Sequence, residues 1–176
     1  MKQVLFFIKG SLIAACGFSQ YHPLVDVTHT WKCTQYGWII TEYVQYFEGD
    51  SIINGMTYSK LQTEYENGDV YQFGLIREDA ATQKVYIWDG ENERLLYDFT
   101  LDEGDEATVF GVGSEQTITI TSVETVNVGE TARKKLNFND AWGPAYWIEG
   151  IGSMYGVPDA ALGMVADYSP VVNCFY

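Results

Sequence analysis

The sequence is poor in the residues that most catalytic and metal sites require. It contains only two histidines, His22 and His29, and three cysteines. Neither a Cys-x-x-Cys nor a His-x-x-x-His spacing occurs, so the sequence predicts no zinc site. A Gly-x-Ser-x-Gly motif is also absent, and both histidines lie near the start of the chain. These features argue against a serine hydrolase of the nucleophile-elbow type.

Basic side chains are also scarce. The 176 residues include 10 Lys and Arg against 24 Asp and Glu, which gives a net charge of −14 and a pI of about 4.3. Nucleic acids and anionic membrane surfaces are bound through basic faces, so neither is expected as a partner. The acid excess favours solubility outside the cell. It also leaves a Ca²⁺ site open, although the EF-hand spacing is absent.

No hydrophobic run is long enough to span a membrane, but the N-terminus carries a short one. Lys2 precedes apolar stretches at residues 4–8 and 12–18, which Lys9 separates, and small residues precede Gln20. A basic start, a short apolar middle and a small-residue exit are typical of an export signal. The sequence therefore predicts a signal peptide over residues 1–19 and a single β-rich domain over residues 20–176, secreted or at the cell surface.

The cysteines allow further interpretations. Residues 12–16, Leu-Ile-Ala-Ala-Cys, resemble a bacterial lipobox, so lipidation of Cys16 and anchoring in the cell envelope is the alternative to free secretion. Cys33 and Cys174 then remain in the mature chain and are a candidate disulfide in an oxidising compartment. Two buried free thiols are the alternative.

Turn residues at regular intervals dominate the rest of the chain. Asn54-Gly55, Asn67-Gly68 and Asp89-Gly90 each separate runs rich in β-branched and aromatic residues, and residues 117–121 alternate Thr and Ile. The only helical candidate is one or two turns over residues 158–165. The sequence thus predicts an all-β, antiparallel meander of roughly nine to eleven strands. Such a meander hides its edges in a barrel-like domain or in a sandwich of two sheets.

Aromatic residues are the main candidates for binding. They make up 15% of the chain, with 13 Tyr and 5 Trp, while an apolar content of 47% excludes a disordered chain. The tryptophans could form a stacking platform for sugars or belong to the core: Trp31, Trp38, Trp88, Trp142 and Trp147. Among the acids, Asp98 and Glu149 each lie within an apolar run, and a facing pair of carboxylates could hydrolyse glycans.

Two motifs make the chain resemble a known group of proteins. They are Leu-Leu-Tyr-Asp-Phe-Thr-Leu-Asp-Glu-Gly-Asp at residues 95–105 and Trp-Ile-Glu-Gly-Ile-Gly-Ser at residues 147–153, followed by Asn-Cys-Phe at residues 173–175. The order of these motifs resembles a β-rich module of secreted proteins from Bacteroidetes-type bacteria, often found with a C-terminal sorting domain for type IX secretion. The resemblance implies export and brings no catalytic residue with it.

Together these observations predict an exported, non-catalytic β domain that binds a glycan, a peptide or a surface protein, or has an accessory role. No catalytic residue, metal ligand or cofactor is expected, with Ca²⁺ left open, and no transmembrane span is expected in the mature form. A carboxylate-dependent hydrolase acting on glycans is the alternative.

The export prediction is tested by the intact mass of the protein purified from its native host. We expect a chain that begins at Gln20, because the signal would be removed. A chain beginning at Cys16 with acyl groups would show a lipoprotein, and a chain retaining Met1 would contradict export. Comparing masses with and without reductant tests the Cys33–Cys174 bridge.

Overall fold

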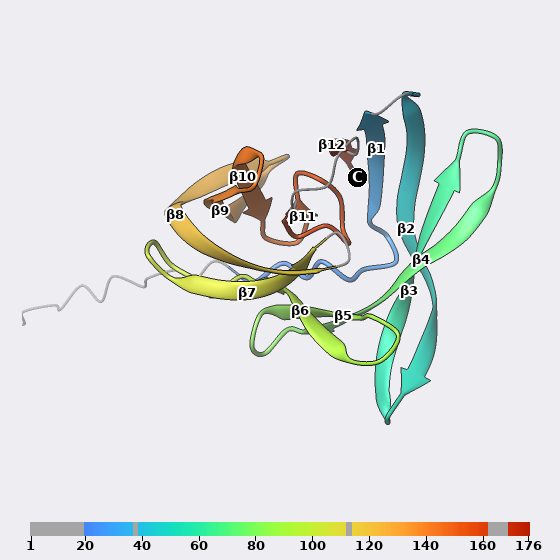
Figure 1. The fold of residues 1–176 in the computed structure, drawn as a ribbon, viewed down its shortest axis with the longest axis horizontal. Helices are drawn as coiled ribbons and strands as arrows, with labels where there is room; N and C mark the ends of the chain where they lie inside the picture. The colour runs from blue at the N-terminus through green and yellow to red at the C-terminus, as the bar shows by residue number, and fades with distance from the viewer. Residues whose placement is uncertain (1–19, 37–38, 112–113, 162–168) are drawn as a thin grey trace, which may run out of the picture.

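The fold is all-β, as the sequence predicts (Figure 1). The computed structural model describes residues 20–36, 39–111, 114–161 and 169–176. The expected signal peptide, including Cys16, lies outside these residues. Two curled antiparallel sheets make up the described part of the chain. No helix there has the length and apolar character needed to cross a membrane.

The larger sheet has seven strands in the order β12-β1-β2-β3-β4-β5-β6. Its strands are β1 (Thr30–Tyr36), β2 (Thr41–Ile53), β3 (Met56–Tyr65), β4 (Val70–Asp79), β5 (Lys84–Trp88), β6 (Glu93–Asp98) and β12 (Ser169–Phe175). Apart from β12, which returns to pair with β1, each strand pairs with the next one in the chain. This is the predicted meander.

The smaller sheet has five strands in the order β11-β10-β9-β8-β7. Its strands are β7 (Glu106–Gly111), β8 (Ser114–Val128), β9 (Thr131–Asp140), β10 (Gly143–Ile148) and β11 (Gly152–Ser153). The described residues thus form twelve strands, slightly more than the sequence predicts, and β11 is only two residues long.

The three predicted hairpin turns are confirmed. Asn54 and Gly55 have φ values of 52° and 80° and join β2 directly to β3, as a two-residue turn with positive φ requires. Gly68 donates its N–H to the carbonyl of Tyr65 at 2.9 Å in the β3–β4 turn. The Asp89 carboxylate accepts backbone N–H groups of the β5–β6 turn.

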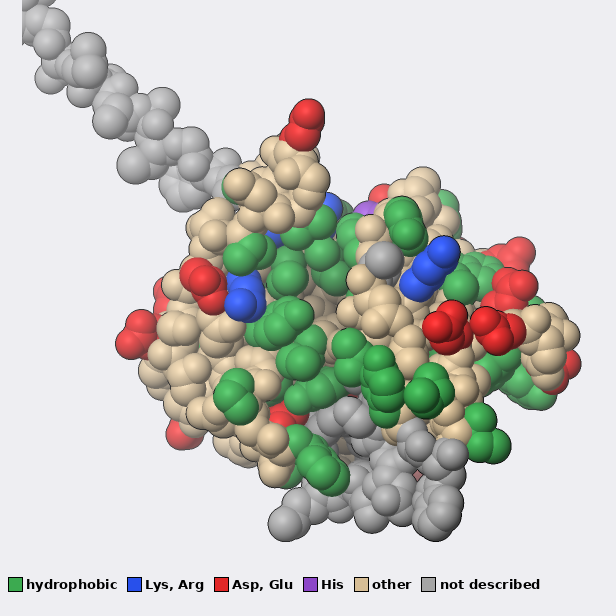
Figure 2. Space-filling model, turned by 90° about the horizontal axis from the view of Figure 1, so that it is seen from above, with side chains coloured by type: hydrophobic (Ala, Val, Ile, Leu, Met, Phe, Trp, Pro, Cys, Tyr) green, Lys and Arg blue, Asp and Glu red, His purple; other side chains and the backbone are tan. Residues whose placement is uncertain are grey.

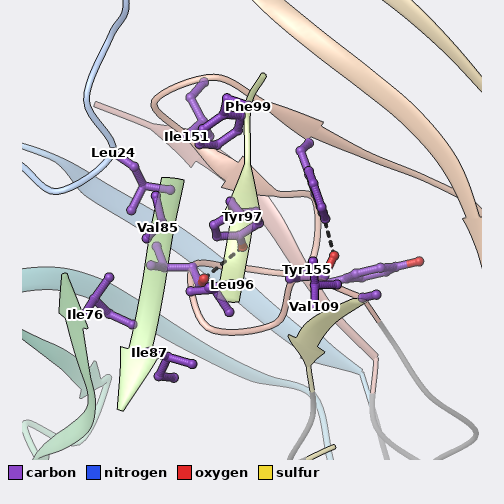
Figure 3. Packing of buried hydrophobic residues seen from close by; sticks show 14 of the residues in the cluster. Leu24, Ile76, Val85, Ile87, Leu96, Tyr97, Phe99, Val109, Ile151 and Tyr155 are labelled. Carbon is purple, nitrogen blue, oxygen red and sulfur yellow. Dashed lines mark hydrogen bonds between the residues drawn. The ribbon is translucent and has the colours of Figure 1, made fainter. Parts of the chain in front are cut away.

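The hydrophobic core is built from both sheets and from the N-terminal segment (Figure 3). Ile118 and Ile120 are buried while the threonines between and beside them are exposed, which confirms the alternation read from the sequence. Leu24, ahead of the first strand, has no exposed surface. Its segment is held because Glu78 of β4 accepts the N–H groups of Leu24 and Val25 at 3.0 and 2.8 Å.

The segment over residues 149–161 lies almost entirely inside the protein although it forms no long strand. Side chains bind its backbone. The indole of Trp31 donates to the carbonyl of Ile151 at 2.8 Å, and the indole of Trp147 donates to that of Ala160 at 2.6 Å. The Tyr97 hydroxyl donates to the carbonyl of Val157 at 2.8 Å. Buried backbone groups need such partners because water cannot reach them.

The helical turns expected over residues 158–165 are absent from their described part. Pro158 to Ala161 form turns and bends, and residues 162–165 lie outside the described ranges. The prediction is wrong for this described part, where the indole of Trp147 binds the carbonyl of Ala160.

Replacing Tyr97 by Phe should lower the free energy of unfolding by about 1–3 kcal/mol, because buried partners are left without a hydrogen bond. Its hydroxyl also accepts the N–H of Ser153 at 3.1 Å. Thermal and urea unfolding measure the loss, with Tyr46→Phe on β2 as the matched control. Equal stability of the two variants would show that the Tyr97 hydroxyl does not hold the buried segment.

Candidate functional site

The five tryptophans do not form one binding platform. Trp31 and Trp147 have no exposed surface and belong to the core, so the binding role that the sequence allowed for them is wrong. Trp88 on β5 is half-buried, with its ring 6.1 Å from that of Tyr58. Trp142, in the β9–β10 turn, is 59% exposed, and Trp38 lies outside the described residues.

The two acids singled out in the sequence hold neighbouring parts of the chain. Asp98 is buried at the end of β6, where it pairs with Lys84 at 2.9 Å and accepts the N–H of Thr100 at 3.0 Å. Burial alone would raise the pKa of Asp98, but the hydrogen bonds from Thr100 and Lys84 outweigh it and lower the pKa below its usual value. The carboxylate is therefore held in its charged form.

Glu149 has an equally local role. Its carboxylate accepts the N–H of His22 at 2.7 Å, and its backbone carbonyl accepts a hydrogen bond from Arg133 at 3.1 Å. It therefore ties the N-terminal segment to the five-stranded sheet. Glu149 and Arg133 also line a pocket of about 740 Å³ with Tyr21, whose hydroxyl donates to Glu78 at 2.5 Å. The Tyr21 hydroxyl, the Glu149 carboxylate and the Arg133 guanidinium of this pocket thus all form hydrogen bonds within the protein.

The described residues contain no disulfide, and Cys33 is a free, buried thiol. The backbone of Cys174 on β12 pairs with Lys32, next to Cys33 on β1, so the chain ends do come together as a bridge would need. Burial raises the pKa of the Cys33 thiol to about 12, although a hydrogen bond with Tyr43 opposes this. The structure has Cys33 as a free thiol and does not confirm the predicted Cys33–Cys174 bridge.

A Ca²⁺ site finds no support in the described part of the chain. No group of three or more His, Cys, Asp or Glu side chains lies close enough together there to hold a metal ion. Asp50, Asp69 and Asp105 take part in turns and hairpins, as their positions next to glycine indicate.

Tyrosines, which the sequence analysis did not single out, line the most distinctive surface of the protein. The rings of Tyr43 and Tyr65 are 5.8 Å apart, and those of Tyr65 and Tyr71 are 6.0 Å apart. Tyr43 is buried, Tyr65 half-buried and Tyr71 exposed, so the row leads from the core to the solvent across β2, β3 and β4.

A groove of about 540 Å³ lies at this end of the seven-stranded sheet, and we call it the tyrosine groove. Its lining is Lys32, Cys33, Glu42, Tyr43, Val44, Glu64, Tyr65, Glu66, Gly68 and Asn173. Three glutamates against one lysine make the groove acidic. Tyr71 and further exposed apolar side chains lie beyond it at the start of β4.

The surroundings of the groove combine apolar and acidic side chains. In Figure 2, hydrophobic and acidic side chains gather at the right, the side on which the β3–β4 hairpin lies in Figure 1. Val70 and Phe73 are 48% and 49% exposed, and Tyr71 is 57% exposed. Exposed apolar groups that gather on one part of a surface mark interaction sites on soluble proteins.

Comparison with known proteins returns no family model, no curated protein and no solved structure that matches this chain. The function therefore has to be argued from the groove and its residues.

Replacing Asp98 by Asn should lower the free energy of unfolding at neutral pH by about 1–3 kcal/mol, since charge-assisted hydrogen bonds are lost. The pKa of Asp98 is lowered in the folded state, so its contribution is present above the usual value of 3.8 and disappears as pH falls through the lowered value. Thermal unfolding from pH 7 down to about 2 measures this.

The matched control for this series is Glu103→Gln, which removes one exposed acid from the loop after β6. The wild-type protein and the Asp98→Asn variant should converge in stability at the acidic end. A difference that stays constant with pH would contradict the assigned role of the carboxylate.

Proposed function

We propose that this chain is an exported, non-catalytic β domain that binds a partner outside the cell through the tyrosine groove. The row Tyr43–Tyr65–Tyr71 carries the proposal, because it places aromatic surface beside acidic side chains at one open end of a sheet. Tyrosine suits binding surfaces since its ring is apolar and its hydroxyl forms hydrogen bonds.

The location is part of the same proposal. The basic, apolar and small-residue pattern of residues 1–19 supports export, and the resemblance to secreted modules of Bacteroidetes-type bacteria agrees with it. The protein would be secreted or held at the cell surface, with a lipid on Cys16 as the alternative form of attachment.

A carboxylate hydrolase is the less favoured function. It would need two facing acids around a substrate. Asp98 is bound by Lys84 and Thr100, and Glu149 is bound by His22. These bonds hold both carboxylates to the protein itself, whereas the groove offers aromatic and acidic surface to a ligand.

Removing the exposed aromatic ring should weaken binding. Tyr71→Ala should reduce the affinity of the mature chain for its ligand by about tenfold, since one buried aromatic contact is worth about 1.4 kcal/mol. Arrays that carry glycans and peptides identify the ligand, and titration of the strongest one measures the change. Melting temperatures of wild type and variant check that folding is unaffected.

Trp142→Ala is the matched control, because it removes an exposed aromatic ring from the five-stranded sheet. It should bind as the wild type does. If Trp142→Ala lost binding and Tyr71→Ala kept it, the site would lie on the other sheet. If a bound glycan were hydrolysed by the wild type and not by Asp98→Asn, the chain would be a hydrolase.

A further inference from the structure

The first half of β4 has an unpaired edge. β4 runs from Val70 to Asp79, but β5 pairs only with Ile76 to Asp79. On the other side, β3 pairs with β4 from Val70 onward. Among the described residues, no strand covers residues 70–75 on the β5 side. In Figure 1 this part of the β3–β4 hairpin projects at the right of the molecule.

The register shows which backbone groups this edge presents. Tyr65 donates its N–H to the carbonyl of Asp69 at 3.0 Å, so these two residues form a hydrogen-bonded pair. In an antiparallel ladder such pairs alternate with pairs whose N–H and C=O groups point outward. The next pair, Glu64–Val70, is therefore outward-pointing, and so is Gln62–Gln72. Val70 and Gln72 direct their backbone groups toward the open edge.

This edge carries neither charge nor proline, although its pairing with β3 shifts register at Phe73, which has no partner between Gln72 and Gly74. Residues 70–75, Val-Tyr-Gln-Phe-Gly-Leu, contain no proline and no charge, and Val70, Tyr71 and Phe73 are exposed. Proteins commonly block sheet edges with charge, proline, β-bulges or very short strands. Of these devices, residues 70–75 have only the irregularity at Phe73, and Val70 to Gln72 pair regularly with β3 before it.

The other sheet edges of the described chain carry that protection. β6 contains Glu93, Arg94 and Asp98, and it lies beside β7 of the other sheet. β12 contains Pro170, and β11 is only two residues long. The uncovered half of β8, beyond its pairing with β7, contains the charged Glu124. The open edge of β4 differs from these edges because it is apolar and uncharged.

Charge selects the kind of strand that fits this edge. Glu66 and Asp69 lie at its start in the β3–β4 turn. An added strand would run in line with β5, and its far end would meet the β5–β6 turn. There Asp89 is paired with Arg94 at 2.8 Å, and Glu91 is exposed. The start of the edge is thus acidic, and Glu91 adds a negative charge at its far end. A second copy of a chain with a net charge of −14 would bring like charges together.

We propose that residues 70–75 bind an extended peptide with basic flanking residues as an additional strand of the seven-stranded sheet. Backbone hydrogen bonds from Val70 and Gln72 would supply much of the affinity, and Tyr71 with Phe73 would contact alternate side chains of the peptide. The inference rests on the proposed binding function and names its ligand class.

A display library of random peptides, selected on the mature chain, tests the proposal. We expect enriched peptides that alternate β-branched or aromatic residues and carry Lys or Arg near their ends. Gln72→Pro should weaken their binding by about tenfold, because it removes one outward N–H and blocks the approach of a strand. Gln72 does not bond to β3 through this N–H, and proline is tolerated at such edge positions.

Gln72→Thr is the matched control, since it keeps the backbone N–H and should bind as the wild type does. Circular dichroism and thermal unfolding check that both variants fold. If Gln72→Pro fails to fold, raising the salt concentration gives the second measurement, because basic peptides should then bind the wild type more weakly.

The outcomes separate this inference from the broader function. Peptides that bind Gln72→Pro as tightly as the wild type but are lost in Tyr71→Ala would keep the binding function and overturn strand addition. Enrichment of acidic peptides, or of none, would overturn the ligand class. Wild-type protein that self-associates through this edge, as seen by sedimentation, would make a second copy the occupant and overturn the proposal.

Discussion

The structure depends on one constraint: an irregular segment passes through the interior, and its backbone must be bonded there. Residues 149–161 are buried apart from the half-buried Met154, and they lack a long strand partner that would satisfy their carbonyls. Trp31, Tyr97 and Trp147 take that role, each from a different strand. These side chains are large enough to fill the core and still carry a donor. The two sheets are therefore joined by hydrogen bonds to the segment between them as well as by apolar packing.

The two motifs behind the family resemblance meet at this segment. Tyr97 comes from the first motif, while Trp147 and Ser153 come from the second. The rings of Tyr97 and Trp147 are 5.2 Å apart and nearly perpendicular, and the N–H of Ser153 donates to the Tyr97 hydroxyl. Gly152 has a φ of 91° and lies so close to Tyr97 that a Cβ would come within 3.1 Å of its hydroxyl. These residues of the two motifs thus belong to the core of the protein and hold the buried segment in place.

Local signals in the sequence were sufficient to predict the strands and hairpins. They were not sufficient to predict the tyrosine groove. Asn54-Gly55 specifies its turn by positive φ alone, so it can be recognised without knowing the rest of the fold. The contact of Tyr43 with Tyr65 depends on the register of β2 against β3, and that register shifts at an irregularity between Phe47 and Asp50. The tryptophans could not be assigned from the sequence either. Trp31 is buried and Trp142 is exposed, and composition does not distinguish the two environments.

Strand lengths explain why exposed apolar residues lie on the β3–β4 hairpin. β3 and β4 have 10 residues each, whereas β5 has 5 and stops where Asp89 binds the backbone of its own turn. The chain therefore turns back before it can cover the first half of β4. Hydrophobic residues at Val70, Tyr71 and Phe73 are costly to leave in water, and burying them inside would require a longer β5. Their presence on an uncovered edge is most simply explained if another strand covers it, which is the role we assign to the peptide.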